Sequence, residues 1–323
     1  MLFSIIVPVY NAEKTIAKCV DSLLRQKVDT QIILVENGSS DKSLELCKAL
    51  NEQYSNVELY ISEESGISLA RNIGLSHANG DVIGFCDADD YYDKDALAKV
   101  KEIFDKNDID IVFSAFTRVY RDSCELQAVK KERIISVHKA IEYITCYPCI
   151  MGSVWNKFYK KELIGNIRFD NELTHLEDGY FNIRLLSEHR DSKVYVTKCC
   201  TYYYIANTES VTGNIENCYD VCGNLKYNVS LYKMLDDLDL FENEKRCIKD
   251  KIYRLSVENI KKIKHHPDWY NNSYDEIKKN FFVFLSRVIR FDTKNRIKLV
   301  LKGLRILIKG KKNEKNTAYY PSK

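Results

Sequence analysis

No stretch of the 323-residue sequence reaches the roughly 20 uninterrupted apolar residues that a transmembrane helix needs. The N-terminal segment has no basic stretch before its apolar residues, so no secretory signal peptide is expected. Internal repeats and low-complexity segments are also absent. The composition is 45% hydrophobic and 29% charged, which is typical of a soluble globular protein.

The eleven cysteines show no metal-binding or disulfide pattern. Cys146 and Cys149 form a C-x-x-C pair, but no second pair at zinc-ligand spacing accompanies it, and none of the six histidines supplies one. The odd number argues against a fully paired disulfide framework. We therefore expect reduced structural thiols and a cytoplasmic protein.

Charge is unevenly distributed along the chain. Residues 281–323 contain twelve Lys or Arg and two acids, whereas the preceding 280 residues carry a net charge of −7. Within 287–312, apolar residues recur at helical spacing and the basic residues fall mostly off that stripe. This pattern predicts an amphipathic helix on an anionic membrane surface, or a helix packed on the protein body with its lysines solvated. Nucleic acid is not an expected partner, because the basic residues lack interleaved aromatics.

Strand and helix patterns alternate over the first hundred residues. Continuous apolar runs predict buried strands, and three helical patterns separate them. Such alternation predicts βαβ units and a mostly parallel sheet in an α/β fold. The strands are expected at 3–9, 31–35, 57–61 and 81–86.

Later patterns predict a strand from Ile109 to about Tyr120, a helix from Ser136 to Cys146, and strand over Val194 to Ile205. After about residue 216 the pattern is helical. We expect one α/β domain over 1–215, with halves 1–95 and 96–215, and a helical extension over 216–323.

Acidic residues follow the fourth predicted strand. Asp87, Asp89 and Asp90 would repel one another unless a cation neutralises them, and Mn²⁺ or Mg²⁺ prefers such oxygen ligands. The alternative is that acids here favour the start of the next helix, particularly Asp90 and Asp93. Polar clusters also follow the first two strands, and ligands collect at the carboxyl ends of parallel strands. These clusters predict a ligand site at one edge of the sheet.

Four segments together resemble the family 2 glycosyltransferases, which are inverting enzymes of GT-A fold, including those that build bacterial surface glycans. They occur in the family's order and usual spacing. The segments are Ser4-Ile5-Ile6-Val7-Pro8-Val9-Tyr10-Asn11, Val35-Glu36-Asn37-Gly38-Ser39-Ser40-Asp41, Gly66 through Ala70-Arg71-Asn72-Ile73-Gly74, and Asp87-Ala88-Asp89.

The resemblance implies donor-binding roles in the first half of the chain. Pro8 and Tyr10 would line the nucleotide base pocket, and Arg71 would face the diphosphate or base. Glu36 stands where the family usually has the first Asp of Asp-Asp-Gly-Ser, which contacts uracil. Asp87 would touch the ribose and help hold the metal, Ala88 would lie on the donor side, and Asp89 would ligate the metal.

The resemblance places a second centre at Leu176-Glu177-Asp178-Gly179. It implies that Asp178 is the general base, since an acceptor hydroxyl must lose its proton as it attacks. From the residues alone, Glu177 and Asp178 could equally complement a helix N-terminus. Trp155 and Lys157 are further acceptor-side candidates, for sugar stacking and phosphate contact, although both could be packing residues.

These patterns predict a metal-assisted transferase that moves a sugar from a nucleotide diphosphate donor, a UDP-sugar, to a hydroxyl of a glycan or lipid-linked glycan at the inner face of the cell membrane. A sugar nucleotidyltransferase is one alternative, but it would want a Gly-rich, Arg-containing loop where this chain has Val9-Tyr10-Asn11-Ala12-Glu13. A catalytically inactive, membrane-associated binding protein is the other alternative, and it predicts damaged acidic motifs.

Overall fold

The computed structural model describes residues 1–146, 149–173, 177–206, 238 and 240–245. The chain divides into two compact units, Met1–Ala206 and Asn207–Lys323. The predicted helical extension falls outside the described residues except at 238 and 240–245, and the basic segment 287–312 lies wholly outside them. In the described part of the chain, no helix is long and apolar enough to span a bilayer.

Four parallel strands form one side of the sheet in the first unit. β1 (Phe3–Val9) is central, with β2 (Thr30–Glu36) and β4 (Val82–Phe85) as its neighbours, and β3 (Val57–Ile61) pairs with β2. Every residue of β1 is buried, as its largely apolar sequence predicts, and the hydroxyl of its one polar residue, Ser4, donates to Gln31 Oε1. The parallel pairing aligns the carboxyl ends of β1, β2 and β4 along one edge of the sheet.

Three helices connect these strands as expected: α1 (Ile16–Leu24), α2 (Ser43–Gln53) and α3 (Ile67–His77). A further helix, α4 (Ala96–Lys106), leads from this part of the sheet to its other side. In α3, a Cβ placed on Gly74 would lie 2.3 Å from Cγ2 of Ile6 on β1. The glycine therefore lets α3 approach the sheet closely, and this approach determines where Arg71, on the same helix, is held.

The rest of the sheet mixes directions. β9 (Lys157–Lys160) lies antiparallel between β4 and β6 (Ile111–Val119), and β10 (Val194–Ile205) then pairs parallel with β6. The strand order is β3-β2-β1-β4-β9-β6-β10-β5. The three short strands are β5 (Tyr91–Tyr92), β7 (Cys124–Gln127) and β8 (Arg133–Ile135). The expected α/β architecture is confirmed, with the antiparallel β9 as an addition that periodicity did not indicate.

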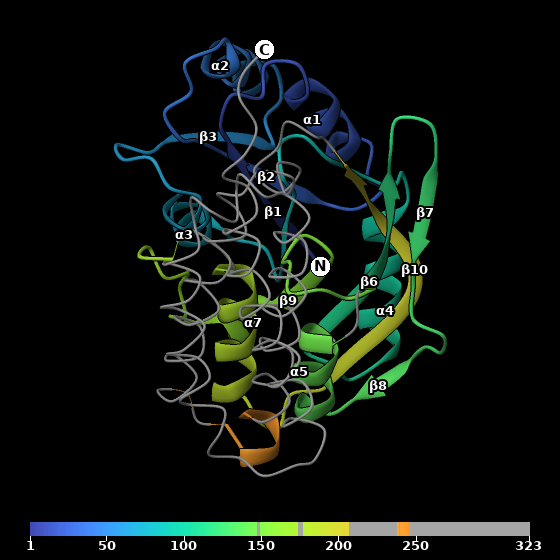
Figure 1. Cartoon of the computed structure of the whole chain (residues 1–323). Helices are drawn as coiled ribbons and strands as arrows, with labels where there is room; N and C mark the ends of the chain where they lie inside the picture. The colour runs from blue at the N-terminus through green and yellow to red at the C-terminus, as the bar shows by residue number, and fades with distance from the viewer. Residues whose placement is uncertain (147–148, 174–176, 207–237, 239, 246–323) are drawn as a thin grey trace, which may run out of the picture. The chain divides into compact units, whose positions relative to one another are not determined.

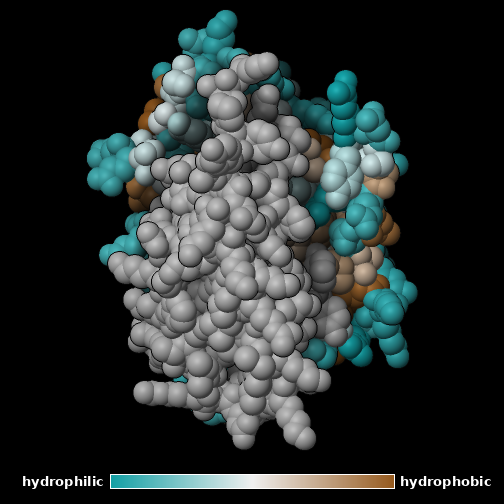
Figure 2. Space-filling view, in the orientation of Figure 1, coloured by the Kyte–Doolittle hydropathy of each residue, from teal (hydrophilic) through white to brown (hydrophobic). Residues whose placement is uncertain are grey.

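Three further helices complete the first unit: α5 (Val137–Cys146), α6 (Lys161–Ile164) and α7 (Glu177–Glu188). Figure 1 shows α5 and α7 side by side, and the two helices are in contact. The described surface visible in Figure 2 is mainly hydrophilic. Its brown areas near β7 and β8 agree with the exposure of Leu126 and Ile134.

Candidate active site

Loops that follow β1 and β2 meet the start of α3 at the carboxyl edge of the sheet. Asn11 accepts a hydrogen bond from the Ser40 backbone N–H through its Oδ1 at 2.9 Å. Asn37 accepts one from the Gly66 N–H, also at 2.9 Å. Side-chain amides thus join three segments that are distant in sequence. The loops after β1 and β2 therefore meet at this edge, where the sequence predicts a ligand site.

Glu36 at the end of β2 is only 3% exposed, and both of its carboxylate oxygens are engaged. Oε1 accepts from the Ser39 N–H at 2.6 Å and Oε2 from the Gly38 N–H at 3.2 Å. Gly38 has φ of +82°, which glycine adopts without steric cost. In this structure the Glu36 carboxylate shapes its own turn, so the expected contact with a base stays a prediction. Nearby, Pro8 is buried and Tyr10 is 59% exposed.

The three acids after β4 have different surroundings. Asp87 is half-buried, Asp89 is exposed, and Ala88 and Asp90 are buried. Removal of water around the loop and the nearby charge of Asp87 raise the pKa of Asp89 to about 6. Burial, followed by the charge of Glu177, raises the pKa of Asp87, although Arg71 opposes that shift. A cation would relieve this crowding of negative charge.

The same loop fits a metal that takes few protein ligands. Among the described residues, no group of three His, Cys, Asp or Glu side chains is arranged to hold a metal ion by itself. Mn²⁺ and Mg²⁺ sites commonly use one or two carboxylates and complete their coordination with water and substrate phosphates. Asp89, which is exposed, and Asp87 match that smaller ligand set.

Asp90 does not cap the next helix, contrary to the alternative drawn from the sequence. Its Oδ2 accepts from the Tyr202 hydroxyl at 2.7 Å, and its Oδ1 accepts from the Ile205 N–H at 2.7 Å. The same Tyr202 oxygen accepts from the Asp87 N–H at 3.0 Å. Burial and the nearby acids raise the pKa of Asp90 to about 9. Asp90 and Tyr202 therefore connect residues 87–90, the acidic loop, to β10.

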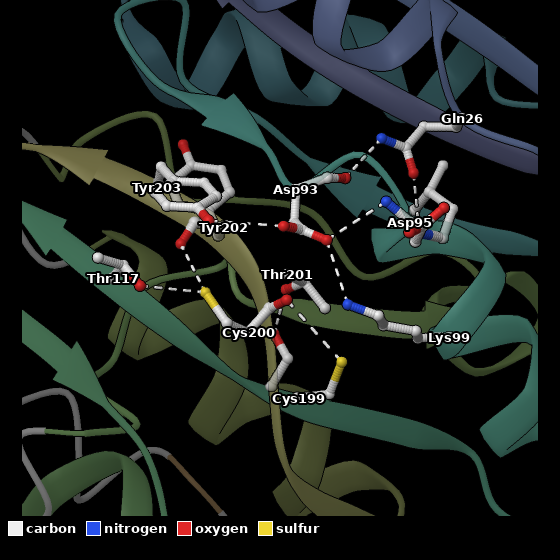
Figure 3. Close-up of polar contacts among 12 residues, drawn as sticks. Gln26, Asp93, Asp95, Lys99, Thr117, Cys199, Cys200, Thr201, Tyr202 and Tyr203 are labelled. Carbon is white, nitrogen blue, oxygen red and sulfur yellow. Dashed lines mark hydrogen bonds and ion pairs between the residues drawn. The ribbon is translucent and has the colours of Figure 1, made fainter.

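Asp93 lies two residues before Asp95, the N-cap residue of α4, so it does not cap the helix as the sequence alternative suggested. Its Oδ1 accepts from the Asp95 N–H at 3.3 Å and pairs with Lys99 at 3.2 Å. Figure 3 shows Asp93 between that helix and Tyr203, whose hydroxyl donates to Oδ2 at 3.5 Å. Asp93 is thus a structural residue that joins α4 to β10.

Arg71 is 3% exposed and contacts three carboxylates. Its Nη1 lies 2.8 Å from Glu177 and 2.7 Å from Asp178, and its Nη2 lies 3.5 Å from Asp87. Despite the cost of burial, these charges raise the pKa of Arg71, so the guanidinium stays protonated. The structure brings together residues that the sequence assigned to separate donor and acceptor centres, and Arg71 is the link between them.

Asp178 is the second residue of α7, and its carboxylate is largely buried. The Val154 N–H donates to Oδ2 at 3.1 Å, while Oδ1 accepts no hydrogen bond from the described residues and lies against Arg71. Burial raises the pKa of Asp178 to about 7; Arg71 opposes this shift, whereas Glu177 and Asp87 add to it. A carboxyl group with this pKa can accept a proton near neutral pH.

Trp155 belongs to the core, which corrects its expected role in sugar stacking. It is 4% exposed. Its ring stacks on Tyr202 and Tyr204 with centroids 4.6 and 5.6 Å away, and it meets Phe116 edge-on at 4.7 Å. No ring face remains open for an acceptor sugar.

Lys157 likewise does not reach toward a phosphate. Its side chain is fully buried, and its amine donates to oxygens of the preceding turn, including the Met151 and Ser153 carbonyls. Burial lowers the pKa of Lys157 to about 7. The expectation of phosphate contact is therefore wrong, because the amine is already surrounded by protein oxygens.

The sequence is similar to known proteins over much of its length. Residues 4–168 match the family model described as "Glycosyl transferase family 2". The chain is 32% identical over 221 residues to the "Uncharacterized glycosyltransferase EpsJ" of Bacillus subtilis (strain 168), covering 65% of this chain and 63% of that protein. It is also 32% identical over 212 residues to the "Minor teichoic acid biosynthesis protein GgaB" of the same organism, covering 62% and 23%. The chain thus spans less than two thirds of either relative.

Solved structures share the fold. The structure of S. aureus TarS 1-349 in complex with UDP superposes with a TM-score of 0.67 at 20% identity, covering 99% of this chain and 93% of that one. A mannosyltransferase from Pyrobaculum calidifontis, in complex with GDP-Man and Mn²⁺, superposes with a TM-score of 0.56 at 14% identity, covering 96% and 85%. At such identities the likeness concerns the fold.

Proposed function

Because the chain belongs to glycosyl transferase family 2 and has the GT-A fold, we propose that it transfers a sugar from a UDP-sugar to a hydroxyl of a glycan or lipid-linked glycan, with inversion at the anomeric carbon. TarS structures contain UDP or UDP-GlcNAc, and two relatives are named for minor teichoic acid biosynthesis. These names support a nucleotide-sugar donor and a bacterial surface glycan as the product.

The observation that carries the proposal is the position and chemistry of Asp178. Its carboxyl group has a pKa raised to about 7 and lies on α7, whereas the acidic loop follows β4. Arg71 contacts both Asp178 and Asp87, so the proposed base lies close to the acidic loop. A proton acceptor on one element and a donor-binding loop on another suit an attack opposite the leaving group.

In the proposed reaction, Asp178 accepts the proton of the acceptor hydroxyl as its oxygen attacks the anomeric carbon. The bond from that carbon to the diphosphate oxygen breaks, and its electron pair stays on the nucleotide diphosphate. Attack from the face opposite the leaving group inverts the carbon. Asp178 ends the step protonated and returns the proton to solvent.

The acidic loop would hold Mn²⁺ or Mg²⁺ through Asp89 and Asp87. When bound, such an ion stabilises the negative charge that develops on the diphosphate. Loops at the same edge, with Pro8, Tyr10 and Glu36, would surround the nucleotide, and Ala88 would lie beside it. The exposed ring of Tyr10 is available for stacking on a base.

We also propose that the protein works at the cytoplasmic face of the cell membrane. The basic and apolar pattern of 287–312 would attach it to anionic lipid, where a lipid-linked acceptor would be found. Binding of the full chain to vesicles with and without anionic lipid tests this part. Equal binding to both would contradict it.

Hydrolysis of UDP-glucose, UDP-galactose and UDP-N-acetylglucosamine in the presence of Mn²⁺ tests the activity without knowledge of the acceptor. We expect at least one donor to release UDP, and Asp89→Ala and Asp178→Asn each to lower that rate by about 10²–10⁴-fold. Asp29→Asn is the control, because Asp29 is an exposed acid away from these loops. Activity unaffected by either site substitution would overturn the assignment.

A further inference from the structure

Lys157 is an unusual residue to find at the start of a buried strand. It is fully buried on β9, and none of the described carboxylates lies within ion-pair distance of its amine. A buried ammonium without a counterion is costly unless other dipoles solvate it. The Phe113 ring, 4.9 Å from Nζ, offers one favourable contact.

Four oxygens of a single turn supply the remaining solvation. They are the carbonyl oxygens of Ile150 at 3.3 Å, Met151 at 3.0 Å and Ser153 at 2.5 Å, and Oδ1 of Asn156 at 2.9 Å. Oxygen atoms of the turn 150–156 thus surround the amine. Met151 has φ of +59°, a conformation that a residue with a side chain seldom adopts. The amine thus contacts the turn at four points, and Asn156 Nδ2 adds a hydrogen bond to the Ile150 carbonyl at 2.9 Å.

The opposite face of the turn contacts Asp178 and its helix. The Val154 N–H donates to Asp178 Oδ2 at 3.1 Å. Asn182 Nδ2 donates to the Gly152 carbonyl at 2.8 Å and to the Asp178 carbonyl at 2.8 Å. A Cβ on Gly152 would lie 3.1 Å from the Cα of Gly179, so the turn lies directly on the first turn of α7.

We propose that Lys157 is a positioning residue for the general base: its ammonium fixes the turn 150–156, and the turn fixes the Asp178 carboxylate through the Val154 N–H. The proposal rests on the role proposed above for Asp178. Lys157 itself touches neither donor nor acceptor.

Loss of the ammonium would leave the Met151 and Ser153 carbonyls and Asn156 Oδ1 without this donor, whereas the Ile150 carbonyl would keep its hydrogen bond from Asn156 Nδ2. The turn would relax to hydrate them, and the Val154 N–H would move away from Asp178. The carboxylate would then be held by Arg71 alone and would be displaced from the acceptor hydroxyl. A displacement of about 1 Å in a catalytic group can cost roughly 100-fold in rate.

The first test compares Lys157→Met with Lys160→Met in the full-length protein. Lys160 lies on the same strand but pairs with Asp110 at the surface, so it is a matched control. The probe is the donor hydrolysed fastest among the three UDP-sugars, with Mn²⁺ present. We expect Lys157→Met to lower kcat by about 10–100-fold with donor KM and UDP affinity unchanged, and Lys160→Met to leave all three unchanged. An unchanged kcat in Lys157→Met would overturn the proposal.

The second test asks whether Lys157 acts through Asp178. Lys157→Met is placed in the Asp178→Asn background, and the residual rate is measured at high enzyme concentration. We expect no further loss, because a misplaced turn has no base left to displace. A further loss of the same size would mean that Lys157 only maintains the fold, which would overturn the proposal. Full activity of Asp178→Asn alone would instead overturn the proposed function.

Gly152→Ala keeps the proposal testable if Lys157→Met does not fold. Its added methyl would lie 3.1 Å from the Gly179 Cα, closer than an ordinary contact, and would shift the turn slightly away from α7 while Lys157 remains in place. We expect the same selective loss of kcat and the same dependence on Asp178. A folded Gly152→Ala protein with normal kcat would show that the turn does not position the base.

Discussion

The Nη1 atom of Arg71 lies 2.7 Å from Oδ1 of Asp178, although the two residues are 107 positions apart along the chain. The same guanidinium reaches Asp87, which directly follows β4. One buried cation therefore contacts both the acidic loop and the residue proposed as general base. If the carboxylate of Asp87 or Asp178 moved, the Arg71 side chain would move with it and would change the position of the other carboxylate.

Arg71→Met should lower the free energy of unfolding by about 3–5 kcal/mol, because it leaves buried carboxylates without their counterion. Arg71→Met with Glu177→Gln should recover part of that loss, since one of the excess negative charges is then removed. Urea unfolding of the two variants and the wild type measures both effects. An Arg71→Met protein as stable as the wild type would mean that the carboxylates are already protonated or solvated.

The rate of donor hydrolysis should increase with pH through about 7. Asp178 acts as a base only when deprotonated, and its pKa is raised to about 7. Below that pH, kcat should fall about tenfold for each unit as the carboxylate is protonated. A kcat profile between pH 5.5 and 8.5 measures the effect. A rate independent of pH down to 5.5 would exclude a base with this pKa.

The raised pKa of Asp178 makes the protein less stable as pH rises, whereas the reaction becomes faster. The folded pKa of Asp178 lies above its ordinary value of 3.8, so the folded protein binds this proton more tightly than the unfolded chain. The contribution of Asp178 to stability is therefore fully present below about pH 4 and decreases as pH rises towards 7. Asp178→Asn should flatten the pH dependence of stability across that range.

Asp89→Ala should remove metal-dependent activity without reducing stability. Its side chain is exposed, so its loss leaves no buried group unsatisfied. We expect Mn²⁺ no longer to strengthen UDP binding in calorimetry, while the melting temperature stays within a degree or so of the wild type. Asp29→Ala is the control. A variant that retains Mn²⁺-dependent UDP binding would transfer the metal role to another residue.

The strand and helix pattern of the first 95 residues was predictable because buried parallel strands require continuous apolar runs, as in β1. The convergence of the loops after β1, β2 and β4 followed from the parallel direction alone. By contrast, the bond from Tyr202 to Asp90 and the burial of Trp155 depend on β10 lying against the acidic loop. No local pattern specifies a contact between residues more than a hundred positions apart.

The type of a side chain was also a poor guide to the role of a residue whose burial depends on distant strands, such as Lys157. Lysine is usually exposed, and the sequence left two roles open for Lys157, phosphate contact and packing. Its burial follows from the insertion of β9 between β4 and β6, which the periodicity of a four-residue strand does not indicate. The positions of the motif residues at the carboxyl ends of β1, β2 and β4 were easier to predict from the sequence, because these residues lie in loops directly after strands.

Glu36→Gln should weaken UDP, CDP and GDP binding by a similar factor. Both Glu36 oxygens accept backbone N–H groups of their own turn, and the amide retains one acceptor. Loss of one charged hydrogen bond costs about 1.5 kcal/mol, or roughly tenfold in affinity if the turn must be ordered to bind. Calorimetry with the three nucleotides measures the change, with the exposed Glu45→Gln as control. A loss confined to UDP would show that Glu36 reads the base.

Trp155 should behave as a core residue in solution. The chain has two tryptophans, so Trp269→Phe leaves Trp155 as the only indole reporter. Because Trp155 is 4% exposed and stacked on Tyr202, its emission should be blue-shifted and should resist quenching by iodide. Trp155→Ala should then lower the free energy of unfolding by about 3–5 kcal/mol, since it empties a large buried volume. An indole that iodide quenches freely, in a protein whose stability is unaffected by Trp155→Ala, would restore the sugar-stacking role, because only an open ring face is accessible to both iodide and an acceptor.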